Sequence, residues 1–286
     1  MRILAIVQAR INSSRLPNKV LLDLEGQPML VRVIERARRA RILDQIVIAT
    51  TSDHSDDPVE ALCQERGYLY YRGSPHDLLD RYYQAARLYG AEVIVRITAD
   101  CPLIDPGVID HTVMAFLGEE NPTKNVSLSE LRWDFAANRL PPPWKRTYPI
   151  GLDTEVCSFP ALHRAWQEAD QPYQREHVMP YIYELERSVH FSTLDHISSE
   201  RQIPKGFFRV LQVDHSPDYG AYRWTVDTQA DLELARKIFA HFEGRDDFTW
   251  LEVLELFHDH PELAAINANV QPKTVRDIDL RNQEAF

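Results

Sequence analysis

Three cations in a short loop near the N-terminus are the residues best suited to chemistry. The apolar run 3–8 is typical of a buried strand, and a polar segment with Arg10, Arg15 and Lys19 follows it. Because ligands of open α/β sheets bind at the carboxyl ends of the strands, cations at this point are placed to hold a polyphosphate. Arginine offers forked donors and lysine a compact charge, and both suit phosphate oxygens. A loop whose charges only keep the protein soluble has the same composition.

Two aspartates stand where further strands are expected to end. Asp100 follows the apolar run 92–97, and Asp227 follows a short strand candidate at 224–226. A carboxylate at a strand end, in the same crevice as the basic loop, is placed to hold Mg²⁺, which takes few protein carboxylates and completes its shell with phosphate and water. Each aspartate can instead cap the helix that follows it, and for Asp227 the local sequence favours this alternative.

The first loop also resembles a known family. Gln8-Ala-Arg10, Ser14-Arg-Leu-Pro17 and Lys19-Val-Leu21 are similar to the opening signature of the CTP-dependent sugar nucleotidyltransferases. That superfamily includes the acylneuraminate and 3-deoxy-manno-octulosonate cytidylyltransferases, and the likeness is greatest to its SpsF-like branch, named for spore coat polysaccharide biosynthesis. Two glycines of the usual signature are Asn12 and Asn18 here, and asparagine tolerates the left-handed backbone that such turns need.

Two more motifs of the family recur at the aspartates. Residues 98–103 match its Thr-Gly-Asp-Cys-Pro-Leu motif, with Ala99 in place of the glycine, and residues 224–228 match its Trp-Thr-Val-Asp-Thr element. The resemblance implies that Asp100 and Asp227 are the metal ligands, for one or two Mg²⁺ ions. It also implies that these aspartates are catalytic residues together with the three cations of the first loop, which would bind the triphosphate.

The resemblance places further contacts to the nucleotide and the acceptor. The implied nucleotide set is Gln8, Ala9, Arg10, Arg15, Lys19, Arg72 and Ser74, with Asp80 and Arg81 as weaker candidates. Matches to family motifs at 148–156 and 175–178 imply the acceptor set, which is Tyr148, Gly151, Asp153, Glu155, Glu176 and His177. On spacing alone, Asp153 and Glu155 are better explained as a solvated strand face, and a lone histidine as a structural residue.

The elements that must position these residues alternate between strands and helices up to about residue 120. Strands are predicted at 3–8, 45–50, 68–72 and 92–97, and helices at 28–39, 58–66, 77–89 and 107–117, the last capped by Asp105. This alternation predicts βαβ units, and hence a single Rossmann-like α/β domain with a mainly parallel sheet and helices on both faces. The resemblance implies the same class, the GT-A-like fold of nucleotide-diphospho-sugar transferases, with an inserted subdomain or lid.

The second half of the chain is less regular. Strands are predicted at 153–157, 189–193, 209–213 and 224–226, and helices at 160–169, 176–185, 229–242 and 249–257. Residues 119–150 are polar and proline-dotted, and we interpret them as a lid or an insertion. The nucleotidyltransferase domain is predicted to span 1–257, and a C-terminal arm to span 258–286.

Composition excludes several classes of protein. A net charge of −11 over 286 residues argues against a general nucleic-acid binder, although a local basic patch can still hold a nucleotide. No apolar run approaches the length of a membrane span, and the N-terminus has no signal-peptide pattern. Three widely spaced cysteines predict neither a disulfide framework nor a zinc site. We therefore expect a cytoplasmic protein that binds neither membrane nor nucleic acid.

The sequence as a whole predicts a nucleotidyltransferase whose partners are CTP and a sugar acceptor. A sugar hydroxyl would attack the α-phosphorus and release pyrophosphate, giving a CMP-sugar of the ulosonic-acid type for surface polysaccharide biosynthesis. The resemblance also implies a homodimer. Three alternatives stay open: a GT-A glycosyltransferase, whose metal-binding Asp-x-Asp has only one acid here, at Asp100; an enzyme that uses UTP or another nucleotide with a sugar 1-phosphate; and a non-catalytic nucleotide-binding module.

Overall fold

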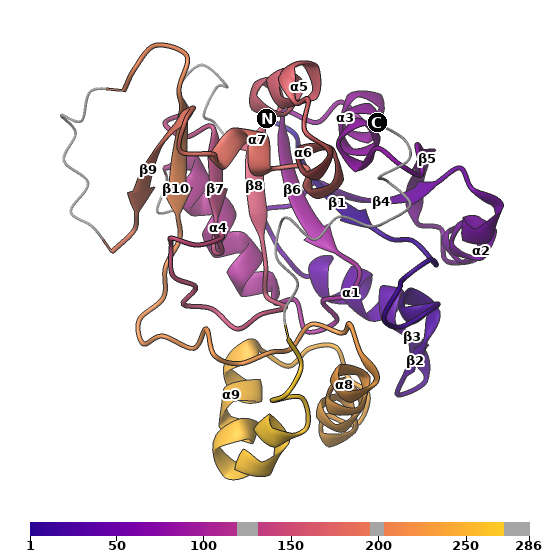
Figure 1. Cartoon of the computed structure of the whole chain (residues 1–286). Coiled ribbons are helices and arrows are strands. Elements are labelled where there is room, and N and C mark those ends of the chain that lie inside the picture. The colour runs from indigo at the N-terminus through magenta and orange to yellow at the C-terminus, as the bar shows by residue number, and fades with distance from the viewer. Residues whose placement is uncertain (119–130, 195–202, 272–286) are drawn as a thin grey trace.

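The centre of the molecule is an eight-stranded sheet. The computed structural model describes residues 1–118, 131–194 and 203–271. The strands of the sheet are β1 (Ile3–Gln8), β4 (Gln45–Thr51), β5 (Leu69–Gly73), β6 (Val93–Thr98), β7 (Phe135–Ala137), β8 (Glu155–Ser158), β9 (Ser188–Ser192) and β10 (Phe208–Gln212). Their order is β5-β4-β1-β6-β8-β7-β10-β9 (Figure 1). All neighbours pair in parallel except β8, which runs antiparallel to β6 and β7. The predicted mainly parallel α/β sheet is confirmed.

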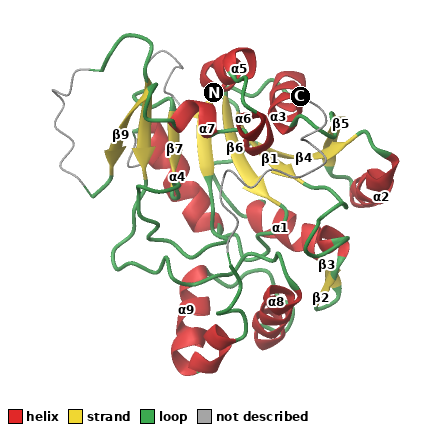
Figure 2. Ribbon diagram, viewed as in Figure 1, coloured by secondary structure: helices red, strands yellow, loops and turns green. Residues whose placement is uncertain are grey.

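Helices cover both faces of this sheet (Figure 2). The helices are α1 (Met29–Ala37), α2 (Asp57–Arg66), α3 (Leu78–Leu88), α4 (Pro106–Leu117), α5 (Phe159–Glu168), α6 (Pro172–His177), α7 (Pro180–Tyr183), α8 (Gln229–His241) and α9 (Trp250–Asp259). Short 3₁₀ turns lie at Lys19–Leu21, His54–Asp56 and Pro261–Ala265, and β2 (Asp23–Leu24) pairs with β3 (Gln27–Pro28) in a small hairpin.

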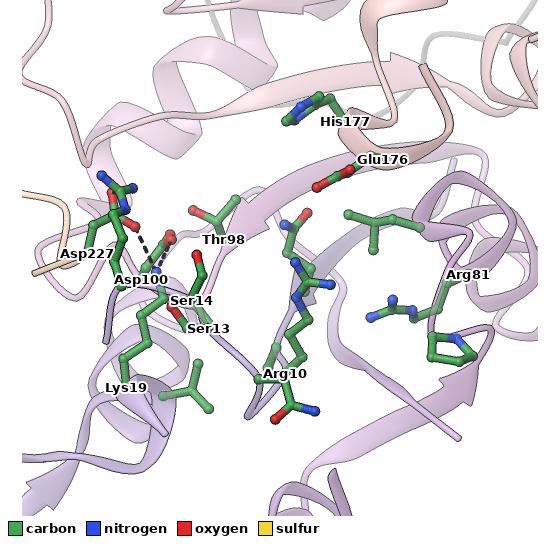
Figure 3. Close-up of a pocket in the computed structure, with 18 of the residues that line it drawn as sticks. Arg10, Ser13, Ser14, Lys19, Arg81, Thr98, Asp100, Glu176, His177 and Asp227 are labelled. Atoms are coloured by element: carbon green, nitrogen blue, oxygen red, sulfur yellow. Dashed lines mark hydrogen bonds and ion pairs between the residues drawn. The ribbon is translucent and has the colours of Figure 1, made fainter. Parts of the chain in front are cut away.

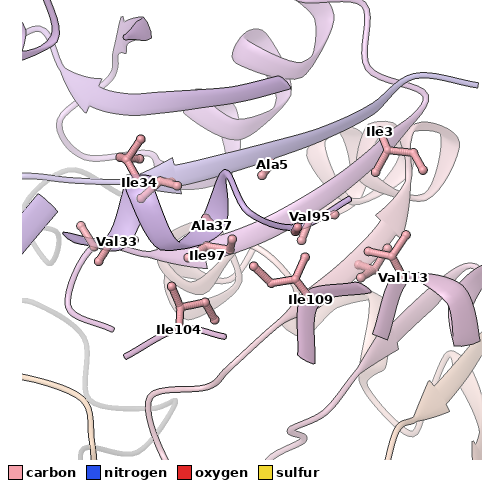
Figure 4. Close-up of a cluster of buried hydrophobic side chains, with 14 of the residues drawn as sticks. Ile3, Ala5, Val33, Ile34, Ala37, Val95, Ile97, Ile104, Ile109 and Val113 are labelled. Atoms are coloured by element: carbon pink, nitrogen blue, oxygen red, sulfur yellow. The ribbon is translucent and has the colours of Figure 1, made fainter. Parts of the chain in front are cut away.

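The core explains why β1 is a continuous apolar run. Ile3, Ala5 and Val7 pack on α1, α2 and α4, whereas Leu4 and Ile6 face α3, α5 and α7 on the opposite side. Because both faces of a parallel sheet are covered, every position of such a strand is buried. Figure 4 shows the first of these two clusters. A third cluster packs α8 and α9 against the segment around residues 224–226.

Two predicted elements differ from the structure. Residues 224–226 form no strand of the sheet; the neighbouring Arg223 makes one isolated bridge to Ile150. The helix predicted at 176–185 is two short helices, α6 and α7, separated at Val178, whose φ is +72°. Pro180 fits this break, because proline has no N–H to donate to an earlier carbonyl oxygen and is favoured in the first turn of a new helix.

The range 119–150 only partly fits a loop. Its residues 119–130 lie outside the described ranges, and β7 falls inside it, in the sheet between β8 and β10. The three residues of β7 are fully buried, so this part of the range belongs to the core. Whether the remainder is a lid stays a prediction.

The described part of the predicted C-terminal arm packs on the body of the protein. Asn267 is buried and its amide donates to the carbonyl oxygen of Arg223 at 2.9 Å and to Asp231 Oδ1 at 2.8 Å. Residues 272–286 lie outside the described ranges. Within the described residues, none of the helices has the length and apolar character needed to cross a bilayer.

Candidate active site

A pocket opens at the carboxyl ends of β1 and β6, where the sequence places its candidate residues (Figure 3). Its volume is about 240 Å³. The first loop provides most of one wall, and the end of β6 and Asp227 lie beside it. The start of α3 and the end of α6 complete the rim. The residues of the first loop and β6 that line it are Gln8, Ala9, Arg10, Asn12, Ser13, Ser14, Arg15, Lys19, Val20, Thr98, Ala99 and Asp100.

Lys19 joins the two predicted metal ligands. Its Nζ lies 2.7 Å from Asp100 Oδ2 and 2.9 Å from Asp227 Oδ1, and it also donates to the carbonyl oxygen of Val226 at 3.2 Å. Burial alone would lower the pKa of Lys19, but the charges and hydrogen bonds of the two carboxylates outweigh burial and raise this pKa. Burial would likewise raise the pKa of Asp100, and Lys19 lowers it. The Lys19 ammonium and the Asp100 carboxylate are therefore charged at neutral pH.

Two arginines hold the other oxygen of Asp227. Arg15 Nη2 lies 2.8 Å from Asp227 Oδ2, and Arg223 Nη2 lies 2.9 Å from the same atom. Arg223 is fixed in turn by Asp231, whose side chain is fully buried. The carboxylate of Asp227 thus lies among three cations from two segments of the chain, Arg15 and Lys19 from the first loop and Arg223 from the segment before Asp227.

The capping alternative does not hold for either aspartate. The helix after Asp227 is capped by Thr228, whose hydroxyl accepts from the backbone N–H of Asp231. The helix after Asp100 is capped by Asp105, as predicted, through the N–H groups of Gly107 and Val108. Both pocket aspartates are left to interact with Lys19 and its neighbours.

Backbone contacts, and not a strand of the sheet, bring Asp227 beside Asp100. The N–H of Val226 donates to the carbonyl oxygen of Asp100 at 2.7 Å, and the hydroxyl of Thr225 donates to the same oxygen at 3.1 Å. The segment is clamped from its other side by the N–H of Trp224, which donates to Ile150 at 2.6 Å. Gly151 permits this approach, because a Cβ there would lie 2.6 Å from the backbone nitrogen of Thr225.

The predicted site residues divide into two groups. Those that line the pocket are Gln8, Ala9, Arg10, Arg15, Lys19, Asp100, Glu176, His177 and Asp227. Those that do not are Arg72, Ser74, Tyr148, Gly151, Asp153 and Glu155. Glu176 and His177 come from the end of α6 and lie across the pocket from Lys19 and the two aspartates (Figure 3).

Arg72 and Ser74 have structural partners outside the pocket. Arg72 pairs with Asp57 at 2.7 Å and with Glu60, and its Nε donates to the carbonyl oxygen of Thr51 at 2.8 Å, so it ties β5 to β4 and α2. The Ser74 hydroxyl accepts from the backbone N–H groups of the turn that leads into α3. Their role in nucleotide binding stays a prediction.

The acceptor residues predicted from the 148–155 segment also serve the fold. Tyr148 is buried against His215 and Trp250, with ring centroids 5.3 and 5.6 Å away. Asp153 pairs with Arg146. Glu155 accepts from Arg96 Nη1 at 2.5 Å and is only 3% exposed, so the solvated strand face that spacing favours is wrong for this residue. The acceptor role of these three residues stays a prediction.

The pocket includes residues that the predicted set omits. Asn12, Ser13 and Ser14 line it within the first loop, and Thr98 lines it at the end of β6. The small hydroxyl side chains beside a basic loop are the signal that points to the two serines. Arg81, a weaker candidate, also lines the pocket, whereas Asp80 does not. Burial and the nearby charge of Arg10 lower the pKa of Arg81 to about 10, so it remains a cation at neutral pH.

A mainly parallel sheet with a basic loop and paired carboxylates at its carboxyl edge defines a nucleotide-binding enzyme of the nucleotidyltransferase class. A family model described as cytidylyltransferase matches residues 4–245. The chain belongs to this cytidylyltransferase family, in its SpsF-like branch, and is a nucleotidyltransferase.

Three curated relatives are similar over most of the chain. An uncharacterised protein of Methanocaldococcus jannaschii is 33% identical over 98% of this chain and 100% of its own length. The spore coat polysaccharide biosynthesis protein SpsF of Bacillus subtilis is 26% identical, with 92% and 96% covered. A 3-deoxy-manno-octulosonate cytidylyltransferase of an Anaeromyxobacter species is 29% identical, with 82% and 96% covered.

A solved structure supports the same grouping. A cytidylyltransferase from Leptospira borgpetersenii superposes with a TM-score of 0.76 at 27% sequence identity. The match covers 96% of this chain and 100% of the other. The similarity therefore extends across both halves of the molecule.

Proposed function

We propose that this protein transfers the CMP group of CTP to a hydroxyl of an acidic sugar of the ulosonic-acid type. The acceptor oxygen bonds to the α-phosphorus as the bond to the bridging oxygen of pyrophosphate breaks, and the hydroxyl proton passes to solvent. The cytidylyltransferase family supports CTP as the donor. The names of the SpsF and octulosonate relatives support an acidic sugar for surface polysaccharide as the product class.

One observation carries the proposal: the convergence of Lys19, Asp100 and Asp227 beside the basic loop. These residues come from three distant parts of the chain, and buried charges are arranged in this way where the protein must manage a highly charged ligand. The pocket next to them is lined by Arg10, Arg15 and hydroxyl side chains. Arg10, Arg15 and Lys19 offer positive charge to a triphosphate, and the two carboxylates can hold the cation that accompanies it.

The same two carboxylates suit Mg²⁺. Oxygens of Asp100 and Asp227 both approach one point, which the Lys19 ammonium takes up, so they can converge on a cation. Among the described residues, no group of three or more His, Cys, Asp or Glu side chains is placed to hold a metal ion. Two carboxylates with phosphate and water as the remaining ligands are what Mg²⁺ takes in nucleotide sites. When bound, the ion would supply Lewis-acid stabilisation of the phosphate charge.

The side chains of the pocket have separate roles in this proposal. Arg10, Arg15 and Lys19 bind and neutralise the triphosphate and the departing pyrophosphate. Glu176 and His177, on the opposite side, orient the acceptor hydroxyl toward the α-phosphorus. Catalysis in this arrangement comes from positioning and charge stabilisation, because none of the roles requires a covalent enzyme intermediate.

Pyrophosphate release tests the proposed reaction. The protein would be assayed with Mg²⁺, each of the four nucleoside triphosphates in turn, and a panel of ulosonic acids and sugar 1-phosphates. We expect release only with CTP and only when an ulosonic acid is present. Release with UTP and a sugar 1-phosphate would overturn both the donor and the acceptor assignment.

A further inference from the structure

Asp56 is a buried carboxylate outside the pocket that is not engaged in capping its own helix. It occupies the position before the first residue of α2, where an aspartate normally accepts from the N–H groups of the next turn. Here its side chain makes no such hydrogen bond, and the residue is only 2% exposed. A buried carboxylate that forgoes the local cap must be satisfied by other partners.

Those partners lie at the first loop and at the end of β4. Asp56 Oδ1 accepts from the backbone N–H of Ile11 at 2.6 Å. Its other oxygen accepts from the hydroxyl of Thr51, which itself is buried and accepts from the N–H of Asp53. Thr51 therefore orients the carboxylate so that its Oδ1 faces the backbone of the first loop.

The peptide at Ile11 is held on both sides. Its N–H is bound by Asp56, and its carbonyl oxygen accepts from the N–H of Asn18 at 3.1 Å. The side chain of Ile11 is buried and belongs to the hydrophobic cluster that includes residues of β1, α1 and α2. Ile11 directly follows Arg10 and lies four residues before Arg15. The position of its backbone therefore helps to fix the points from which both arginine side chains extend.

We propose that Asp56 is a positioning residue, which holds the backbone of the first loop at Ile11 so that its cations are in place before the nucleotide binds. This inference rests on the proposed function, because it takes the first loop as the triphosphate site. Asn12 makes a second contact between the same two segments, from its side-chain amide to the Ser55 hydroxyl at 2.9 Å. The loop after β4 thereby acts as a fixed support for the loop after β1.

Binding of CTP with Mg²⁺, measured by calorimetry, tests the role of Asp56. Asp56→Ala removes the charged acceptor of the hydrogen bond from the Ile11 N–H. We expect this variant to bind CTP about tenfold or more weakly than wild type. Asp56→Asn keeps an oxygen for Ile11 and a donor for Thr51, so we expect affinity within about threefold of wild type. Thr51→Val, which keeps the side-chain shape and removes the orienting hydroxyl, should fall between the two and guards against failure of the alanine variant to fold.

Asp105→Ala is the matched control. Asp105 is as deeply buried and also accepts from backbone N–H groups, including that of Trp250 at 2.9 Å, but it does not line the pocket. We expect it to lower thermal stability without a comparable loss of CTP affinity. If Asp105→Ala weakened CTP binding as much as Asp56→Ala did, or if Asp56→Ala bound CTP like wild type, the positioning role would be wrong.

Amide hydrogen exchange separates this inference from the proposed function. In the absence of nucleotide, we expect the peptide that contains Ile11 to exchange faster in Asp56→Ala than in wild type or in Asp105→Ala. Unchanged protection at Ile11 would overturn the inference whatever the ligand. Wild-type protein that bound no CTP, with protection lost as expected in Asp56→Ala, would instead refute the proposed function and leave Asp56 as the support of this loop.

Discussion

At the scale of single residues, the local sequence cannot distinguish a capping aspartate from one that serves a site. Asp100, Asp105 and Asp227 all precede a helix, yet only Asp105 caps one. The difference lies in distant partners, because Lys19 approaches the other two from a segment far away in the chain. The family resemblance predicted a site role for both aspartates, and the acceptor role that it implies for Glu155 stays a prediction. The ion pair of Glu155 with Arg96 could not be predicted from spacing.

Loss of the central cation should slow turnover. We expect Lys19→Ala to lower kcat about 10²-fold, because removing one charge that stabilises the transition state costs roughly 3 kcal/mol. Asp100→Asn should have an effect of similar size. Steady-state kinetics would measure both, with the exposed Lys237→Ala as the control. Turnover within a few-fold of wild type in Lys19→Ala would contradict its role.

The ion pair behind Asp227 should make stability depend on acid pH. Burial would raise the pKa of Asp231, but hydrogen bonds from Arg223 and Asn267 lower it below its ordinary value of 3.8. A carboxyl whose pKa is lowered by folding stabilises the native state above that ordinary value, and this contribution is lost as pH falls below it. Denaturant unfolding from pH 7 to pH 3 should therefore show a steeper loss of unfolding free energy in wild type than in Asp231→Asn. Equal slopes would contradict the account.

At the scale of elements, strands that are buried on both faces can be predicted and short or irregular ones cannot. β1, β4 and β6 are long apolar runs, which is the pattern of a parallel sheet covered by helices. β7 has only three residues, too few for a periodic signal, and the structure alone reveals that it lies in the sheet. Residues 224–226 have the composition of a strand, but they are clamped by single backbone contacts to Asp100 and Ile150.

This clamp can be tested at Gly151. Gly151→Ala should destabilise the fold and lower turnover together, because φ is +110° and the added Cβ would lie 2.6 Å from the nitrogen of Thr225, displacing the segment that carries Asp227. Gly67→Ala is the control, since its φ is +66° and nothing lies within 4 Å of a Cβ there. We expect Gly67→Ala to cost only about 1 kcal/mol of unfolding free energy from backbone strain, with normal turnover. A Gly151→Ala variant with normal turnover would show that the clamp does not position Asp227.

At the scale of the whole molecule, net charge and composition do not reveal the basic pocket. The net charge of −11 hides the local basic patch, because cations from the first loop and Arg81 gather at one pocket of an acidic protein. The fold class followed from alternating strands and helices together with the resemblance. The way α8 and α9 pack on the segment before Asp227 did not, since it depends on contacts between residues far apart in the chain.

We propose that two copies of the chain associate. The support is at β9, the last strand of the sheet, which is flanked by Leu185 and Leu194 with exposed fractions of 59% and 61%. An edge strand between exposed apolar side chains is a surface that a second copy can cover. Light scattering should give a mass twice the 33.2 kDa of the chain, and Leu194→Lys should shift it toward the single mass. A wild-type mass of one chain at micromolar concentration would contradict the proposal.

The most direct test of the proposed site is the dependence of CTP binding on Mg²⁺, compared by calorimetry between wild type and an Asp100→Asn/Asp227→Asn double variant. If these carboxylates hold the ion that accompanies the nucleotide, wild type should bind CTP at least about tenfold more tightly with Mg²⁺ than without it, and the double variant should lose this difference. A double variant that kept the full Mg²⁺ dependence, or a wild type that bound CTP no more tightly with Mg²⁺ than without it, would contradict the account.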